Sequence, residues 1–310
     1  MKINLANIKK AEKILNKSEC IAIPTETVYG LAGNAYSNKA CKQIFKLKKR
    51  PKNNPLIVHY HNHEDLKKDC IFNDNFLKLY KKFCPGPITF ILDLKRKSRV
   101  SKFATNNSKT LAVRFPKHPV ARMLLKKLNY PLAAPSANIS TKVSAVDSND
   151  VKDDFGKKIK YVLEGGKSTI GIESTIVDLR NRPKILRLGG LETSLIQKVL
   201  NKKVLMKNNS PEISSPGQFK LHYSPGIPIR LNVKKIKKGE ACLLISKKKK
   251  SKSNYYFLSK SGNLKEAARN LYSILRKIKK NKHKSIVVKK IPNKGLGKTI
   301  NDRLIRASKF

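Results

Sequence analysis

The sequence predicts an α/β protein in which several strands end in loops that converge on one cleft, followed by a smaller parallel α/β unit. Short apolar segments of strand length, such as residues 88–94 and 131–134, run into loops marked by glycine, proline and small polar residues. After residue 229, strand-like and helix-like segments alternate. Between the two parts, residues 206–228 are rich in Ser, Pro, Gly and Asn, which is typical of a linker.

Two basic residues are expected where the first long helix of the sheet region ends. Apolar side chains at helical spacing predict helices over residues 7–19 and 37–50, and Pro51 stops the second helix. Lys48 and Arg50 therefore leave the last turn of that helix. Positive charge at a helix C-terminus is favourable without any ligand, so these residue types alone do not establish a site.

The next strand, residues 55–60, carries His59 at its end, with His61 and His63 following at a spacing of two. Side chains two apart share one face of a strand, which is compatible with a metal cluster. The strand pattern ends near residue 60, however, and no carboxylate or cysteine ligand is fixed by spacing, so a zinc site is not favoured. His59 is the histidine expected to face a site.

An arginine stands in the otherwise apolar strand 110–115. A lone arginine is costly to bury unpaired, so Arg114 is expected either to reach an edge or to meet an anion. The strand at residues 131–134 ends in a proline and is followed by Ser136 and Asn138, which could form only a local turn. A strand that runs into a glycine turn is expected within residues 161–169, and further strands are expected at 173–179 and 184–190, with Ser174 at a strand mouth and Arg187 near a strand end.

Two segments, "GGKST" and "GLGKT", resemble the end of a phosphate-binding P-loop. Such a loop needs a glycine five positions before the Gly-Lys pair, and here those positions hold Tyr161 and Pro292. Neither segment is therefore expected to hold a phosphate by that mechanism.

The formal net charge of +49 suggests a nucleic-acid partner. Only 13 of the 69 basic residues are arginines, and the lysines are scattered, so the charge favours weak, nonspecific RNA binding over specific recognition. The five cysteines contain no Cys-x-x-Cys pair, which argues against a zinc ribbon or a disulfide framework. No signal peptide or membrane-spanning pattern is evident, so a soluble, cytoplasmic protein is expected.

Several motifs in fixed order carry a family resemblance. "PTETVYGLAGNA", "KKRP", "LAVRFP", "PLAAPSAN", "ESTIVD" and "LRLGG" resemble the YrdC-like domain of the threonylcarbamoyl-AMP synthase family. "SPGQFKLHYSP" and "GLGKTINDRLIRAS" are similar to the linker and C-terminal domain of its two-domain members. The resemblance implies a YrdC-like catalytic domain at 1–205, a linker or lid at 206–228, and a small Rossmann-like domain at 229–310. The catalytic domain would be a twisted mixed sheet with a basic concave cleft.

The resemblance further implies an L-threonylcarbamoyladenylate synthase. Such an enzyme joins L-threonine, bicarbonate or CO₂, and ATP with Mg²⁺, releases pyrophosphate, and supplies a downstream complex that modifies tRNA. Direct tRNA contact would be weak or nonspecific. By the same resemblance Lys48 and Arg50 are the catalytic residues. The implied ATP contacts are Lys48, Arg50, Asn54, Thr110, Ser136, Asn138, Ser144, Arg187 and Tyr223. The implied threonine contacts are Thr27, His59, Arg114, Ala134 and Ser174, and no protein-bound metal is implied.

Two alternatives remain at the level of the sequence. A non-catalytic RNA-binding module would use the same basic cleft, but it does not account for the paired Lys-x-Arg and Ser-x-Asn motifs. A YrdC-like domain serving carbamoyl transfer in hydrogenase maturation would need acylphosphatase and zinc-finger regions, for which the chain has neither the length nor the cysteine pairs.

Overall fold

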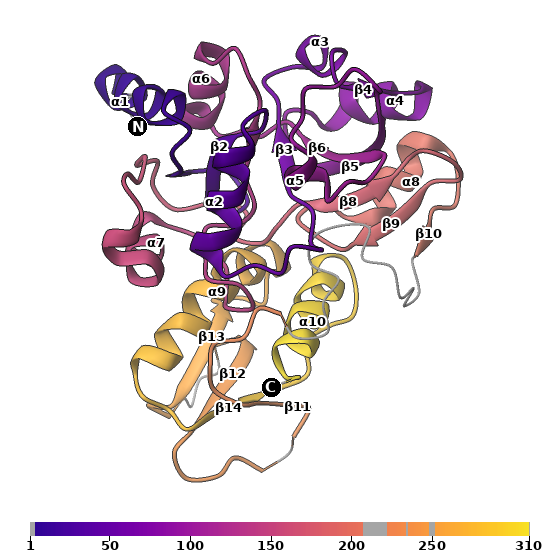
Figure 1. Cartoon of the computed structure of the whole chain (residues 1–310). Coiled ribbons are helices and arrows are strands. Elements are labelled where there is room, and N and C mark those ends of the chain that lie inside the picture. The colour runs from indigo at the N-terminus through magenta and orange to yellow at the C-terminus, as the bar shows by residue number, and fades with distance from the viewer. Residues whose placement is uncertain (1–3, 207–221, 234, 248–251, 310) are drawn as a thin grey trace.

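The computed structural model describes residues 4–206, 222–233, 235–247 and 252–309. A ten-stranded mixed sheet forms the larger part and a four-stranded parallel sheet the smaller part, which lies below it in Figure 1. The α/β sheet region and the smaller parallel α/β unit expected from the sequence are thus both present. Among the described residues, we find no helix that combines the length and the apolar character needed to cross a bilayer.

The large sheet has the strand order β1-β2-β7-β3-β6-β5-β8-β9-β10, and β4 pairs with β5 beside this path. The pairs β3–β6, β5–β8 and β9–β10 are parallel, and the other pairs are antiparallel. The strands are β1 (Ile21–Ile23), β2 (Gly30–Asn34), β3 (Ile57–His59), β4 (Cys70–Ile71), β5 (Ile88–Leu94), β6 (Thr110–Arg114), β7 (Leu132–Ala133), β8 (Thr175–Asp178), β9 (Lys184–Arg187) and β10 (Leu205–Met206).

Helices surround this sheet, and most begin at a side chain that caps the first turn. Asn4, Ser37, Asn73 and Asp147, for example, each accept a backbone N–H of the helix that follows. The helices are α1 (Leu5–Asn16), α2 (Asn38–Lys48), α3 (His63–Leu66), α4 (Asp74–Phe83), α5 (Lys102–Thr105), α6 (Pro119–Lys127), α7 (Ser148–Phe155), the 3₁₀ turn η1 (Gly156–Lys158) and α8 (Thr193–Leu200).

The smaller sheet has the order β11-β14-β12-β13, with every pair parallel. Its elements are β11 (Ile229–Leu231), β12 (Glu240–Ser246), β13 (Tyr255–Ser259), α9 (Leu264–Lys280), β14 (Ser285–Val288) and α10 (Leu296–Ala307). Helix α9 buries one face because its apolar residues recur every three to four positions, from Ala267 and Ala268 to Ile278.

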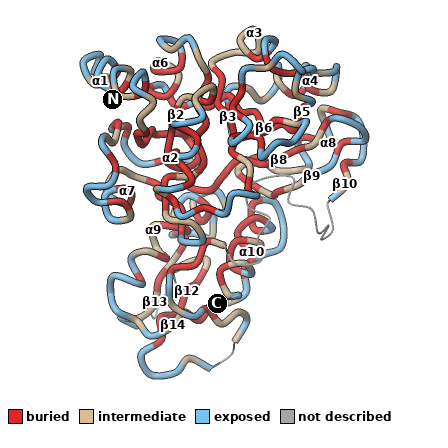
Figure 2. The backbone as a smooth tube through the Cα atoms, in the orientation of Figure 1, coloured by how far each residue is buried: buried red, intermediate tan, exposed pale blue. Residues whose placement is uncertain are grey.

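The two parts share an apolar core. Val28, Val143 and Ile172 of the larger part belong to the same buried cluster as Leu271 and Leu304 of the smaller part. Figure 2 shows buried backbone continuing from the central strands of the large sheet toward α9 and α10. The smaller part is therefore packed against the larger one through an apolar interface.

The structure differs locally from the sequence-based expectations. The strand expected at the start of residues 161–169 is reduced to an isolated bridge between Val162 and Ala22. Helix α1 begins at Leu5 because Asn4 caps it, and it ends at Asn16 rather than at residue 19. Strand β11 was not expected. Most of the expected linker, residues 207–221, lies outside the described residues.

Candidate active site

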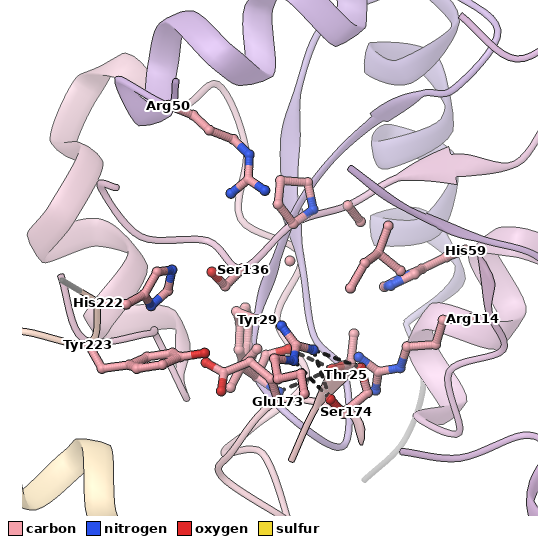
Figure 3. Close-up of a pocket in the computed structure, with 16 residues that line it drawn as sticks. Thr25, Tyr29, Arg50, His59, Arg114, Ser136, Glu173, Ser174, His222 and Tyr223 are labelled. Atoms are coloured by element: carbon pink, nitrogen blue, oxygen red, sulfur yellow. Dashed lines mark hydrogen bonds between the residues drawn. The ribbon is translucent and has the colours of Figure 1, made fainter. Parts of the chain in front are cut away.

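Strand ends and the loops beyond them meet at one pocket (Figure 3). Its walls come from the loops after β1 and β7, the ends of β3, β6 and β9, and the residues just before β8. The lining residues are Thr25, Val28, Tyr29, Gly30, Arg50, Ile57, His59, Arg114, Ala134, Pro135, Ser136, Glu173, Ser174, Arg187, His222 and Tyr223.

Many residues expected from the sequence line this pocket although they are far apart in the chain. They are Arg50, His59, Arg114, Ala134, Ser136, Ser174, Arg187 and Tyr223. The other expected residues, Thr27, Lys48, Asn54, Thr110, Asn138 and Ser144, do not line it.

Arg50 reaches the pocket because α2 ends in a tight turn. Lys49 adopts the left-handed conformation (φ 51°), and the Arg50 N–H donates to the carbonyl of Phe45 at 3.0 Å. The Arg50 guanidinium donates from Nε to the Asn54 carbonyl at 3.0 Å and from Nη2 to the Pro55 carbonyl at 2.9 Å. Burial, and then the charge of Arg187, lower the pKa of Arg50 to about 9. No carboxylate of the described chain forms an ion pair with Arg50. An anion that enters the pocket would therefore relieve the repulsion between the Arg50 and Arg187 guanidiniums.

Lys48 lies behind the pocket wall. Its ammonium donates to the carbonyls of Ser136 and Asn138, at 2.6 and 2.5 Å, and the residue is 1% exposed. The Ser136 hydroxyl in turn donates to Asn138 Oδ1, and Asn138 Nδ2 donates to two further carbonyls. Burial, with Arg50 adding to it, holds the pKa of Lys48 well below its usual value. In this structure Lys48 positions the Ser-x-Asn loop and does not face the pocket.

Arg114 and His59 stand side by side as register partners on the parallel strands β6 and β3. Arg114 Nη2 lies 2.7 Å from Glu26 Oε1, and the Lys117 N–H donates to Glu26 Oε2 at 2.9 Å. The anion that a buried arginine requires is therefore Glu26, from the Thr-Glu-Thr turn. Within the described chain, Arg114 Nε and His59 Nδ1 have no hydrogen-bond partner. Burial, and then Arg114, keep the pKa of His59 well below its usual value, so its imidazole is neutral at pH 7.

Ser174 and Arg187 form a second fixed pair in the pocket. The Arg187 guanidinium donates to the Ser174 carbonyl at 2.8 and 3.1 Å and to the Ser174 hydroxyl at 3.1 Å. The Thr89 hydroxyl lies 2.7 Å from the Ser174 hydroxyl. These contacts hold the Ser174 hydroxyl and the Arg187 guanidinium together just before the start of β8.

Glu173 is a pocket residue that the sequence analysis missed. Its carboxylate accepts from Ser144 Oγ at 2.6 Å, from the Tyr272 hydroxyl at 2.9 Å and from Arg303 Nε at 3.0 Å. Burial alone would raise the pKa of this carboxyl, but Arg303, Arg187 and the Ser144 hydrogen bond lower it to about 2. Its place before Ser174 in "ESTIVD" was the available signal, whereas nothing in the sequence pairs it with Arg303.

His222 and Tyr223 close one side of the pocket (Figure 3). Their ring centroids are 4.0 Å apart, and burial lowers the pKa of His222 to about 3, so its imidazole is neutral. Neither His222 Nδ1 nor the Tyr223 hydroxyl has a partner in the described chain. Together with His59 and Arg114, this gives unpartnered polar atoms on both sides of the pocket, as expected for a site that binds a polar ligand.

The remaining expected residues lie outside the lining of the pocket. The Thr27 hydroxyl is 2.9 Å from that of Thr25, and Ser144 contacts Glu173. Asn54 holds Arg50 through its carbonyl, and its own Oδ1 is buried without a partner in the described chain. Thr110 lies at the opposite end of β6 from Arg114, with its hydroxyl 2.8 Å from that of Ser108.

The "GGKST" segment packs against the loop after β1. The Gly165 N–H donates to the Tyr29 hydroxyl, which donates to the Gly166 carbonyl at 2.9 Å, and the Ser168 hydroxyl donates to the Thr25 carbonyl. A Cβ at Gly165 would lie 2.4 Å from the Pro24 ring, so only glycine fits there. The segment supports the pocket wall and is not a P-loop.

Among the described residues, no group of three or more His, Cys, Asp or Glu side chains could hold a metal ion. Among the described residues that line the pocket, Glu173 is the single carboxylate, and its oxygens are already engaged by Ser144, Tyr272 and Arg303. The residues present therefore do not form a metal site of their own. The described residues are compatible with a metal that arrives bound to phosphate oxygens.

The mixed sheet, its arginine-lined pocket and the added parallel sheet define a two-domain α/β protein with a YrdC-like first domain. The crystal structure of E. coli YciO shares the fold of that domain, with a TM-score of 0.55 at 23% identity over 60% of this chain and 90% of that chain. A family model described as "Telomere recombination" matches residues 13–189, and one described as "Threonylcarbamoyl-AMP synthase, C-terminal domain" matches residues 191–309. The chain belongs to the threonylcarbamoyl-AMP synthase family.

Similar proteins cover nearly the whole chain. The threonylcarbamoyl-AMP synthase of Pyrococcus abyssi is 32% identical over 98% of this chain and 94% of its own length. The Bacillus subtilis enzyme of the same name is 34% identical over the same shares. The crystal structure of P. abyssi Sua5 complexed with L-threonine matches with a TM-score of 0.91 at 32% identity, over 99% of this chain and 96% of that one.

Proposed function

We propose that the pocket joins L-threonine, bicarbonate and ATP into threonylcarbamoyl-AMP with release of pyrophosphate. The observation that carries this proposal is that the chain resembles threonylcarbamoyl-AMP synthases over 98% of its length and gathers cationic and hydroxyl side chains in one buried pocket. The domain limits expected from the sequence, 1–205, 206–228 and 229–310, are kept as part of this proposal.

The chemistry requires that an anion attack a polyanion. The threonine amine and bicarbonate give a carbamate and water, and a carbamate oxygen then attacks the α-phosphorus of ATP as pyrophosphate leaves. Electrostatic repulsion opposes this approach, so fixed cations and alignment of the two partners are the main protein contributions. Mg²⁺ would accompany ATP and neutralise part of the phosphate charge.

Arg50 and Arg187 are the proposed cations of the phosphate end. Both line the pocket, and the charge of Arg187 contributes to lowering the pKa of Arg50. The Ser136 hydroxyl and Tyr223 complete this end, while Lys48 and Asn138 keep the Ser136 loop in place. Asn54, Thr110 and Ser144 remain proposed ATP contacts, although none of them lines the pocket and Thr110 lies at the opposite end of β6 from Arg114.

Arg114 and His59 are proposed to bind the amino acid, with Ala134, Ser174 and Thr27 nearby. The unpartnered Arg114 Nε suits the threonine carboxylate, and the neutral His59 can hydrogen-bond to a polar group of the substrate without adding charge. Placing the amino acid at the Arg114 end and the phosphates at the Arg50 end lets the carbamate form between them.

Release of pyrophosphate by the purified chain tests this function. Release should require ATP, Mg²⁺, threonine and bicarbonate together, and omission of threonine or bicarbonate should return the rate to background. Serine in place of threonine serves as a matched control, because it lacks one methyl group. Release that is indifferent to threonine would refute the proposed reaction.

The product is proposed to pass to a separate complex that modifies tRNA in the cytoplasm. The net charge of +49 is consistent with weak contact between this chain and tRNA, and such contact would weaken steeply as salt is raised.

A further inference from the structure

Glu173 is the buried carboxylate of the pocket to which the proposed reaction gives no role. Within the described chain, two of the three side chains that hydrogen-bond to its carboxylate, Tyr272 and Arg303, come from the C-terminal domain, on α9 and α10 respectively. Its third partner, Ser144, belongs to the catalytic domain. The wall of the pocket is therefore partly held by side chains that lie beyond the linker.

Arg303 occupies the centre of this arrangement. It is 1% exposed, donates from Nε to Glu173 and from Nη2 to the Leu188 carbonyl at 2.7 Å, and pairs with Asp302. Its guanidinium also lies over the ring of Tyr223, 4.6 Å from the ring centroid. One side chain of α10 thus contacts both Glu173 and the linker tyrosine of the pocket.

Tyr272 makes the same two contacts from α9. Its hydroxyl donates to Glu173, and its ring stacks on Tyr223 with centroids 5.8 Å apart and an interplanar angle of 17°. Tyr223 therefore rests on a platform formed by Arg303 and Tyr272, while its own hydroxyl stays buried without a partner in the described chain.

The backbone before Glu173 is also fixed against α9. Gly171 has a φ of 75°, and a Cβ there would lie 2.3 Å from the carbonyl oxygen of Arg269. On the other side, the Thr299 hydroxyl of α10 donates to the Gly189 carbonyl at 3.1 Å. A displacement of the C-terminal domain would thus move the pocket wall.

Arg303 also balances the charge of the buried Glu173 carboxylate. Without it, the buried carboxylate of Glu173 would be left facing a pocket that is proposed to receive phosphates, and it would attract the remaining cations of that pocket. The charge of Arg187 already contributes to lowering the pKa of Glu173. With Arg303 in place, the charge of Glu173 is balanced from the C-terminal domain.

We propose that Arg303 and Tyr272 are positioning residues through which the C-terminal domain sets ATP affinity, by holding Glu173 and by supporting Tyr223. This inference rests on the proposed function only in taking ATP as the nucleotide. It gives the C-terminal domain a role in the catalytic pocket, although neither residue faces the pocket itself.

The test compares two arginines that both cross the domain interface. Arg303→Met removes the contacts that Arg303 makes with two pocket residues, Glu173 and Tyr223. Arg276→Met removes a second interdomain contact, because Arg276 of α9 pairs with Asp154 at 2.8 Å and donates to the Val143 carbonyl, and it does not line the pocket. ATP and threonine dissociation constants are measured by calorimetry on each full-length variant, after circular dichroism has established that it is folded.

We expect Arg303→Met to weaken ATP binding by about tenfold or more, as for a lost hydrogen bond to a charged group, and to leave threonine binding within about threefold. Tyr272→Phe should weaken ATP binding by a smaller factor, and Arg276→Met should leave it within about twofold. If Arg303→Met fails to fold, Arg303→Met with Glu173→Gln removes the unpaired charge, and it should still bind ATP weakly because the platform under Tyr223 is missing.

The inference is overturned if the folded Arg303 variants bind ATP as the unmodified chain does, or if Arg276→Met loses as much affinity as Arg303→Met. Because ATP binding is measured without turnover, a chain that shows this pattern but releases no pyrophosphate would retain the inference and refute the proposed reaction.

Discussion

Replacing Arg50 with alanine is expected to lower kcat/KM for ATP by about 10²–10³-fold, the loss typical for one fixed group that stabilises transition-state charge. Arg50 lines the pocket beside Arg187 and has no carboxylate partner in the described chain, so its charge is available to phosphates. Pyrophosphate release at subsaturating ATP measures the effect. The kcat/KM of Arg50→Lys should lie between that of the unmodified chain and that of Arg50→Ala, because lysine keeps the charge but lacks the planar guanidinium.

Loss of fold must be separated from loss of charge in this experiment. The Arg50 side chain also holds the carbonyls of Asn54 and Pro55, so its removal loosens the loop after α2. Lys46→Ala, an exposed change on the same helix, is the control and should retain full activity. A folded Arg50→Ala variant with near-normal turnover would remove Arg50 from the phosphate end.

Replacing Arg114 with alanine is expected to have two effects. It should raise the threonine KM at least about tenfold, because the proposed partner of the carboxylate is lost. It should also destabilise the protein by about 3–5 kcal/mol, because Glu26, with a side chain only 6% exposed, loses its ion-pair partner. Urea unfolding and threonine-dependent kinetics measure the two effects separately.

A second variant distinguishes a binding role from a structural one. In Arg114→Met with Glu26→Gln, the buried charge is removed on both sides, so most of the stability should return. Threonine KM should stay raised, since the guanidinium is still absent. If the double variant regains normal threonine dependence along with its stability, then Arg114 only balances Glu26.

Local sequence features indicated several of the residues that line the pocket. The proline-terminated strand 131–134 and the Lys-x-Arg sequence at a helix end were visible because turns and helix ends have short-range signals. The missing glycines ruled out a P-loop, and the structure gives the "GGKST" segment a supporting role beside Tyr29. The arginine in an apolar strand was expected either to reach an edge or to meet an anion, and the structure pairs it with Glu26.

What the sequence could not show is which distant residues pair. Arg114 meets Glu26 across 88 residues, Lys48 reaches the Asn138 carbonyl across 90, and Arg303 reaches Glu173 across 130. Such pairings depend on how strands and domains come together, which leaves no periodic pattern in the chain. The expectation that Lys48 faces the phosphates stays a prediction, since in this structure its ammonium is occupied by the Ser-x-Asn loop.

The central claim is that one pocket joins three substrates into a single adenylate. The most direct test supplies ¹⁴C-bicarbonate and ³H-threonine with unlabelled ATP and Mg²⁺, quenches early, and separates the nucleotides by chromatography. A nucleotide species carrying both labels in equal amounts, formed in step with pyrophosphate, is the predicted result. Conversion of ATP to ADP, or pyrophosphate release with no doubly labelled nucleotide, would contradict the account.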